Sequence, residues 1–258
     1  LIHPSSLGKA MHMIVGFAVA VILFEGGMNL RLNHIKREQQ VIRQLITVGA
    51  LVMAVGGVIS SKFIIGWDWR NSILFGVLII VTGPTVISPL LKRLRFRRSV
   101  STVLEAEGVL LDAIGAVLAV VVLEIALSPS GLSFVNGFFH IISRLLSGVI
   151  FGAAGGLGLA LLLRIRRFIP ESLENVFMLS MVFALFQISN TISAESGVVA
   201  VTIAGLVVGN TKTAVRRELR DFEEEMTVLL IGMLFILLAA DVQIVKLTSL
   251  GWRGISLV

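Results

Sequence analysis

The chain has 258 residues, of which 56% are hydrophobic and only 15% are charged, and its mean hydropathy is +0.96. A soluble domain carries about 25% charged residues, so this composition cannot cover a globule of this size with polar groups. Soluble enzymes, nucleic-acid-binding proteins and disordered proteins are therefore excluded as first interpretations, and an integral membrane protein is predicted. The sequence contains no cysteine, which excludes disulfides and thiolate metal sites.

Eight apolar segments are long enough to cross a bilayer, which requires about 20 helical residues. Their approximate limits are 11–30, 41–66, 70–91, 100–127, 134–163, 173–191, 194–210 and 226–245. A ninth begins near residue 250 and is cut off at the C-terminus, and the chain starts at Leu1 rather than Met. We therefore predict an all-α, polytopic membrane helical bundle with a single transmembrane domain, and we interpret the sequence as an internal fragment of a larger membrane protein.

The basic residues alternate between the two ends of the predicted helices. Of the 22 Lys and Arg residues, 16 lie in the connections near 31–43, 92–98, 164–167 and 211–220. Cytoplasmic loops of membrane proteins carry an excess of Lys and Arg, so these four connections are predicted to be cytoplasmic. The same rule explains the net charge of +6 without any nucleic-acid partner.

The most informative acidic residue is Asp112, near the middle of the span 100–127. A carboxylate at the bilayer centre costs about 2.5–3.5 kcal/mol on insertion scales, so it normally faces a cavity or a partner and has a function. A helix turns 100° per residue, which predicts one small and acidic face formed by Glu105, Gly108, Asp112, Gly115 and Ala119. The alternative is a structural Asp capped by a neighbouring backbone amide.

The preceding span contains Val81–Thr85 (VTGPT) near its centre. Gly83 and Pro84 together disfavour a continuous helix, and a break at this depth frees backbone carbonyl and amide groups. Such a break is tolerated where the freed groups line a polar cavity, although a simple proline kink is the alternative. Thr82 and Asp112 would then form an oxygen-lined site for a monovalent cation or a proton.

Three further acidic residues lie in or near the spans. Glu25, at the cytoplasmic end of its helix, is either an additional site residue or a side chain that reaches the interface. Glu107 lies about 140° around the helix from Asp112 and requires a basic partner. Arg144 is one candidate for that partner, and a residue outside this sequence is another. Glu124 lies near the outer end of its span and is interpreted as interfacial.

The motifs resemble those of the monovalent cation:proton antiporters of the sodium/hydrogen exchanger type, in particular the bacterial NhaP-like members. The resemblance lies in Phe24–Leu30 (FEGGMNL), Thr82–Pro84 (TGP), Glu105–Ala113 (EAEGVLLDA) and Ile203–Asn210 (IAGLVVGN), in this order and at this spacing. It implies an inverted-repeat antiporter fold with broken core helices, truncated at both ends. It also implies a homodimer in the inner or plasma membrane of a prokaryote, in which the core moves against a dimerisation domain.

The resemblance assigns a role to each matching residue. It implies that Asp112 binds the ion, that Glu107 is a structural residue paired with a basic group, and that Thr82 belongs to the broken helix. Gly83 replaces the Asp of the family's break and Leu111 replaces the Asn that usually precedes the binding Asp.

A further departure is Gly108, which stands where Ser is common in the family. The three replacements leave fewer oxygen ligands than a typical sodium site has. Sodium, potassium and a looser site completed by water therefore all remain open.

These observations predict a secondary transporter that exchanges one monovalent cation for one proton by alternating access, with lipid as its surroundings and without a cofactor or catalytic residues. Binding of either ion would neutralise Asp112 and lower the cost of carrying it past an apolar barrier. A cation channel or proton-conducting protein is the nearest alternative. An intramembrane enzyme is disfavoured because its motifs are missing, and a purely structural subunit would be indifferent to neutralisation of Asp112.

Overall fold

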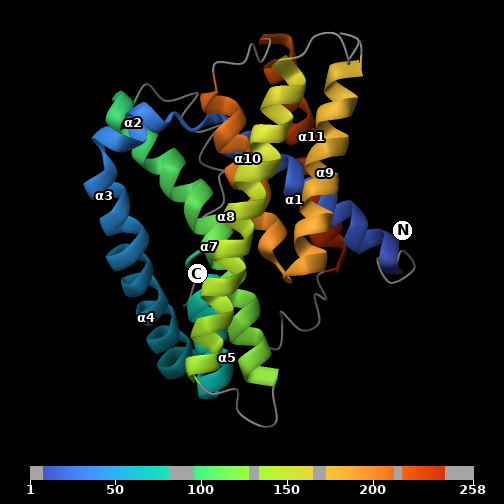
Figure 1. Ribbon diagram of the computed structural model, residues 1–258. Coiled ribbons are helices and arrows are strands. Elements are labelled where there is room, and N and C mark those ends of the chain that lie inside the picture. Colours follow the sequence, from blue (N-terminus) through green and yellow to red (C-terminus); the bar gives the residue numbers. More distant parts are fainter. Residues whose placement is uncertain (1–7, 82–95, 128–133, 165–172, 212–216, 242–258) are drawn as a thin grey trace.

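The computed structural model describes residues 8–81, 96–127, 134–164, 173–211 and 217–241. Within these ranges every regular element is a helix, which confirms the all-α prediction. The elements are α1 (Gly8–Asn29), α2 (Leu32–Arg37), α3 (Gln39–Gln44), η2 (Leu45–Gly49), α4 (Ala50–Ser60), η3 (Ser61–Ile65), α5 (Trp69–Leu78), α7 (Arg98–Leu127), α8 (Phe134–Arg164), α9 (Glu174–Ile192), α10 (Ser196–Asn210) and α11 (Arg217–Asp241). Figure 1 shows a bundle in which α7 to α11 run alternately down and up.

Most helices begin and end within one turn of the predicted limits. This holds for α1, α7, α8, α9 and α10, and for the continuous helical run from α3 to η3. One span differs, because α11 begins at Arg217 instead of residue 226. Helix α5 covers the first part of the predicted span 70–91 and ends at Leu78, and the part of that span from residue 82 onward lies outside the described residues. The early start of α11 has a simple cause, since the charged stretch before residue 226 is rich in Glu, Arg and Leu, which are strong helix formers.

Helix α10 forms the centre of the bundle between α1 and α8 (Figure 1). Ten of its 15 residues are buried, as expected for a helix that is apolar on all sides. Glycines allow its neighbours to approach closely: a Cβ on Gly205 would collide with the carbonyl oxygen of Phe24 in α1, and one on Gly152 of α8 would collide with that of Ala200. Close backbone approach through small residues is the usual packing mode of helices in membranes.

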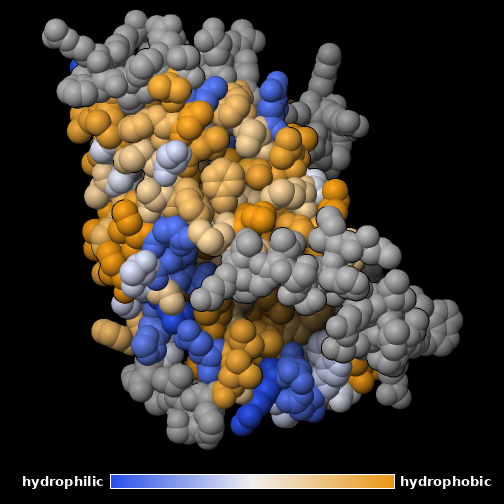
Figure 2. Space-filling model, turned by 90° about the vertical axis from the view of Figure 1, so that its right-hand side faces the viewer, coloured by the Kyte–Doolittle hydropathy of each residue, from blue (hydrophilic) through white to orange (hydrophobic). Residues whose placement is uncertain are grey.

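The outside of the bundle is largely apolar. Leu, Ile, Val and Phe side chains of α4, α9 and α11 are exposed, among them Val52, Ile188 and Phe235. Figure 2 shows hydrophobic residues over much of the face on which α9 and α11 lie. Among the described residues, four helices are long and apolar enough to cross a membrane, at 39–65, 99–127, 139–164 and 174–192. An apolar exterior over a packed interior is the arrangement of an integral membrane protein.

The described parts of the basic connections gather at one end of the bundle. Helix α2, the start of α7, the end of α8 and the start of α11 all lie at the top of Figure 1. The turn between η3, which contains Lys62, and α5, which contains Arg70, lies at the opposite end. The basic and the less basic connections, which alternate along the sequence, thus lie at opposite ends of the folded chain.

Candidate ion-binding site

Asp112 lies midway along α7, a helix of 30 residues without a proline. Its side chain is half-buried, while its neighbours Leu111 and Ala113 are buried in the core. Within the described ranges, no side chain forms a hydrogen bond or an ion pair with the Asp112 carboxylate. The carboxylate is therefore held at the middle of an apolar helix, the position at which an acidic group is most costly in a bilayer.

The chain just beyond α5 packs against α7 one turn from Asp112. A Cβ built on Gly115, one turn along α7 from Asp112, would lie 2.6 Å from Cγ2 of Val81. The amide groups of Ile80 and Val81 donate to the carbonyls of Val77 and Leu78, three residues back, so the helix tightens into a turn as it ends. The chain thus leaves α5 beside Gly115. The predicted site residues Thr82, Gly83 and Pro84 follow directly and lie outside the described residues.

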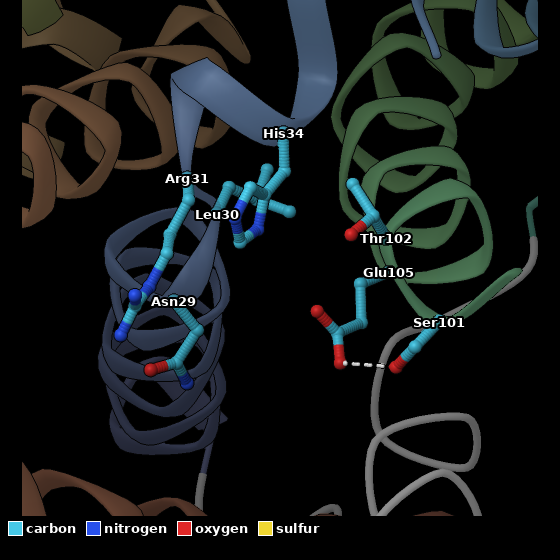
Figure 3. A pocket seen from close by; sticks show the side chains of 7 residues that line it. All are labelled: Asn29, Leu30, Arg31, His34, Ser101, Thr102 and Glu105. Carbon is cyan, nitrogen blue, oxygen red and sulfur yellow. Dashed lines mark hydrogen bonds between the residues drawn. The ribbon is translucent and has the colours of Figure 1, made fainter. Parts of the chain in front are cut away.

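Glu105 lies two turns before Asp112 on the same face of α7, and the buried Gly108 lies between them. Its carboxylate accepts a hydrogen bond of 3.2 Å from the Ser101 hydroxyl. Figure 3 shows Glu105 and Thr102 pointing from α7 into a cavity of about 340 Å³. The opposite wall is formed by the end of α1 and by α2, from Asn29 to His34.

Glu107 and Glu25 are both half-buried. The Glu25 carboxylate accepts a hydrogen bond of 2.7 Å from the Asn29 amide on the next turn of α1. The suggested pairing of Glu107 with Arg144 is wrong, because Nη2 of Arg144 lies 2.8 and 2.9 Å from the two carboxylate oxygens of Glu124. Glu124, near the outer end of α7, thus forms an ion pair with α8 in addition to its predicted position near the interface. Two residues on different helices cannot be paired from the periodicity of each helix alone.

The sequence reasoning missed the role of Asn210, at the end of α10. Its side-chain nitrogen donates to the carbonyls of Leu30 (2.7 Å) and Leu206 (2.8 Å), and its side-chain oxygen accepts from the backbone amide of Leu32 (2.8 Å). One side chain therefore holds the junction between α1 and α2, which forms a wall of the cavity. The available signal was an Asn that ends an apolar, glycine-containing helix.

Comparison with known proteins identifies the family of the chain. The family described as "Sodium/hydrogen exchanger, transmembrane" matches residues 1–258, the whole chain. The chain belongs to this sodium/hydrogen exchanger family. It is 26% identical over 257 residues to a protein of Methanocaldococcus jannaschii named "Probable Na(+)/H(+) antiporter 2", covering 93% of this chain and 60% of that protein. It is 27% identical over 230 residues to the "K(+)/H(+) antiporter NhaP2" of Shewanella oneidensis, covering 88% of this chain and 39% of the relative.

A solved structure has the same fold. It is the sodium proton antiporter MjNhaP1 from Methanocaldococcus jannaschii, with a TM-score of 0.69 at 20% identity. The match covers 93% of this chain and 57% of MjNhaP1. The chain thus spans about 40–60% of the length of these three proteins. Over 93% of its own residues, it has the same fold as the corresponding part of MjNhaP1.

Proposed function

We propose that the chain forms an ion-translocating part of a secondary transporter that exchanges a monovalent cation for a proton. The observation that carries the proposal is the position of Asp112, half-buried midway along α7 and one turn from the Gly115 against which the end of α5 packs. Family membership and the names of the relatives, which are Na+/H+ and K+/H+ antiporters, support the same reaction.

The exchange follows from the cost of an unneutralised carboxylate. A charged Asp112 at the bilayer centre is unfavourable, whereas one that binds a proton or a monovalent cation is neutral. The site therefore moves between the two sides only when it carries one ion or the other, and this couples the two fluxes. A single such carboxylate favours electroneutral exchange of one cation for one proton.

Sodium or potassium would be held by Asp112 together with oxygens of the predicted break at Thr82, Gly83 and Pro84. Hard monovalent cations prefer oxygen ligands, and a broken helix supplies backbone carbonyls at the required depth. Glu107 and Gly108 would support this site from α7. Glu25 would contribute a second carboxylate from α1 if the site extends to that helix.

We further propose that the basic end of the bundle faces the cytoplasm and that the protein works as a homodimer in a prokaryotic plasma membrane. The clustering of α2 with the basic ends of α7, α8 and α11 supports this orientation. The exposed apolar side chains of α4, α9 and α11 provide surface for lipid and for a second protomer.

The proposal is tested by measuring cation-dependent proton flux in proteoliposomes with an imposed pH gradient. Asp112→Asn removes the charge with little change in volume and is expected to reduce sodium- and potassium-driven flux to background. Glu225→Gln removes an exposed carboxylate from α11 and serves as the control, with flux expected near the wild-type level. Full activity of Asp112→Asn would contradict the assignment. Currents whose reversal potential follows the cation gradient alone would identify a channel instead.

A further inference from the structure

The cavity beside Glu105 lies at the basic end of the bundle, between α7 and the junction of α1 with α2. It is lined by Asn29, Leu30, Arg31, His34, Ser101, Thr102 and Glu105. A second hollow of about 220 Å³ lies next to it and shares His34 and Thr102 with it. The cavity thus lies against α7 at the end of the bundle that is rich in Lys and Arg.

We infer that Glu105, Ser101 and Thr102 form a loading site where the transported monovalent cation binds before it reaches Asp112. This inference rests on the proposed antiport and adds a second, separate cation site to it. The site would bind the ion weakly in the cavity, from which the ion passes along α7 to the deeper carboxylate.

The geometry of α7 connects the two carboxylates. Seven residues of helix rise about 10.5 Å and return to nearly the same face, so Asp112 lies two turns deeper than Glu105 in the same row. The residue between them on this face is Gly108, which has no side chain to fill the space. The two carboxylates therefore lie in one row on α7, separated on that face by a residue without a side chain.

The donor atoms of the cavity suit a hard cation. Ser101 donates its hydroxyl hydrogen to one Glu105 oxygen, and Figure 3 shows the other carboxylate oxygen pointing into the cavity. The hydroxyl-bearing residues Ser101 and Thr102 both line this space. Oxygen ligands of this type, completed by water, are those that sodium and potassium prefer.

The basic groups of the cavity explain why binding there would be weak. Arg31 is exposed, and its side chain runs along the far wall, away from Glu105 (Figure 3). His34 is half-buried and projects into the cavity from α2. Neither residue forms an ion pair with Glu105 within the described part of the chain. These two basic residues in the cavity lining lower the attraction of the Glu105 carboxylate for a cation without cancelling it. A loading site requires this balance, because the ion must leave it again.

The test is the dependence of transport on cation concentration at constant pH, in proteoliposomes that contain equal amounts of each protein. Glu105→Gln is expected to raise the KM for sodium or potassium roughly fivefold, the factor that one carboxylate contributes to a cation about 4 Å away in a mostly aqueous setting. The maximal rate should stay within about twofold of wild type, because saturating cation replaces the loading step. Asp112→Asn abolishes transport at every concentration, so failure of the loading site is distinguishable from failure of the antiport itself.

Glu38→Gln is the matched control, since Glu38 lines only the neighbouring hollow at the same end. An unchanged KM in Glu105→Gln overturns the inference, as does an equal rise in Glu38→Gln, which would indicate a general effect of surface charge. A lost maximal rate with unchanged KM also overturns it, because Glu105 would then act structurally.

A charge swap provides a second measurement if Glu105→Gln accumulates poorly. Ser101→Glu combined with Glu105→Ser moves the carboxylate by one turn within the same cavity. The swapped protein is expected to show a KM close to that of wild type. A KM as high as that of Glu105→Ser alone would count against a cation site in this cavity.

Discussion

Replacement of Glu124 by Gln tests the ion pair that connects α7 with α8. In the native protein, Nη2 of Arg144 contacts both carboxylate oxygens of Glu124, at 2.8 and 2.9 Å. The side chain of Arg144 is only 10% exposed, whereas that of Glu124 is 42% exposed. The two partners have therefore lost very different amounts of hydration, and this asymmetry determines which substitution costs more stability.

The magnitude follows from the two limiting cases. Exposed ion pairs contribute at most about 1 kcal/mol, and removal of one partner from a fully buried pair costs about 3–5 kcal/mol. Glu124→Gln leaves a charged guanidinium buried, and Nη1 of Arg144 already lacks a partner among the described residues, so a cost of about 2 kcal/mol is expected. Arg144→Met keeps most of the buried side-chain volume and leaves a carboxylate that water can reach, so about 0.5 kcal/mol is expected.

Thermal unfolding of the purified protein in detergent measures this difference. At about 2–4 °C per kcal/mol, Glu124→Gln should lower Tm by roughly 4–8 °C and Arg144→Met by roughly 1–2 °C. The double variant, Glu124→Gln with Arg144→Met, should be more stable than Glu124→Gln alone because it contains no buried unpaired charge. The reasoning is refuted if Arg144→Met is the more damaging single change, or if the double variant loses the sum of the two.

Two other predictions concern packing and orientation. Gly205→Ala places a methyl group against the carbonyl of Phe24 and should lower the stability measured by thermal unfolding by at least about 2 kcal/mol. Gly158→Ala is the control, because its methyl group meets nothing within 4 Å and should leave stability unchanged or raise it. Equal effects of the two substitutions would contradict the close packing of α1 and α10. Because the sequence has no cysteine, Lys36→Cys and Arg70→Cys each introduce a single reactive thiol. An impermeant maleimide should label Arg70→Cys in intact cells and Lys36→Cys only in inverted vesicles, and labelling of both from one side would refute the proposed orientation.

Hydropathy predicted the bounds of most helices to within one turn. A helix that crosses the bilayer needs about 20 apolar residues, so the length of an apolar segment indicates the length of the helix. Helix α7 illustrates this, since its apolar run and its observed bounds coincide. The method reports where a chain avoids water, however, and not where a helix begins. Helix α11 starts at Arg217, in a stretch too polar to register as a span, because charged residues with high helix propensity continue the helix into water.

The depth of Asp112 could be predicted from the sequence because it depends only on the place of this residue within one continuous helix. The partner of Arg144 could not, because it depends on how α7 and α8 are rotated against each other, which periodicity along one chain leaves open. The cavity beside Glu105 was missed for a related reason. His34, Ser101 and Thr102 lie at helix ends, where polar residues are expected and attract no attention until the fold brings them together.

The two carboxylates of one α7 face have different surroundings, and this difference supports the separate roles proposed for them. Glu105 borders a cavity whose lining includes the hydroxyl-bearing residues Ser101 and Thr102, where its charge is less costly than in the core and an ion could approach and leave it. Asp112 lies two turns deeper, between buried neighbours, where an uncompensated charge is costly and a bound ion relieves that cost. In the proposed antiport, a cation would therefore gain little at Glu105 and more at Asp112, which would favour its movement inward along this face. A proton that replaced the cation at Asp112 would release it again, and an exchanger requires this reversibility.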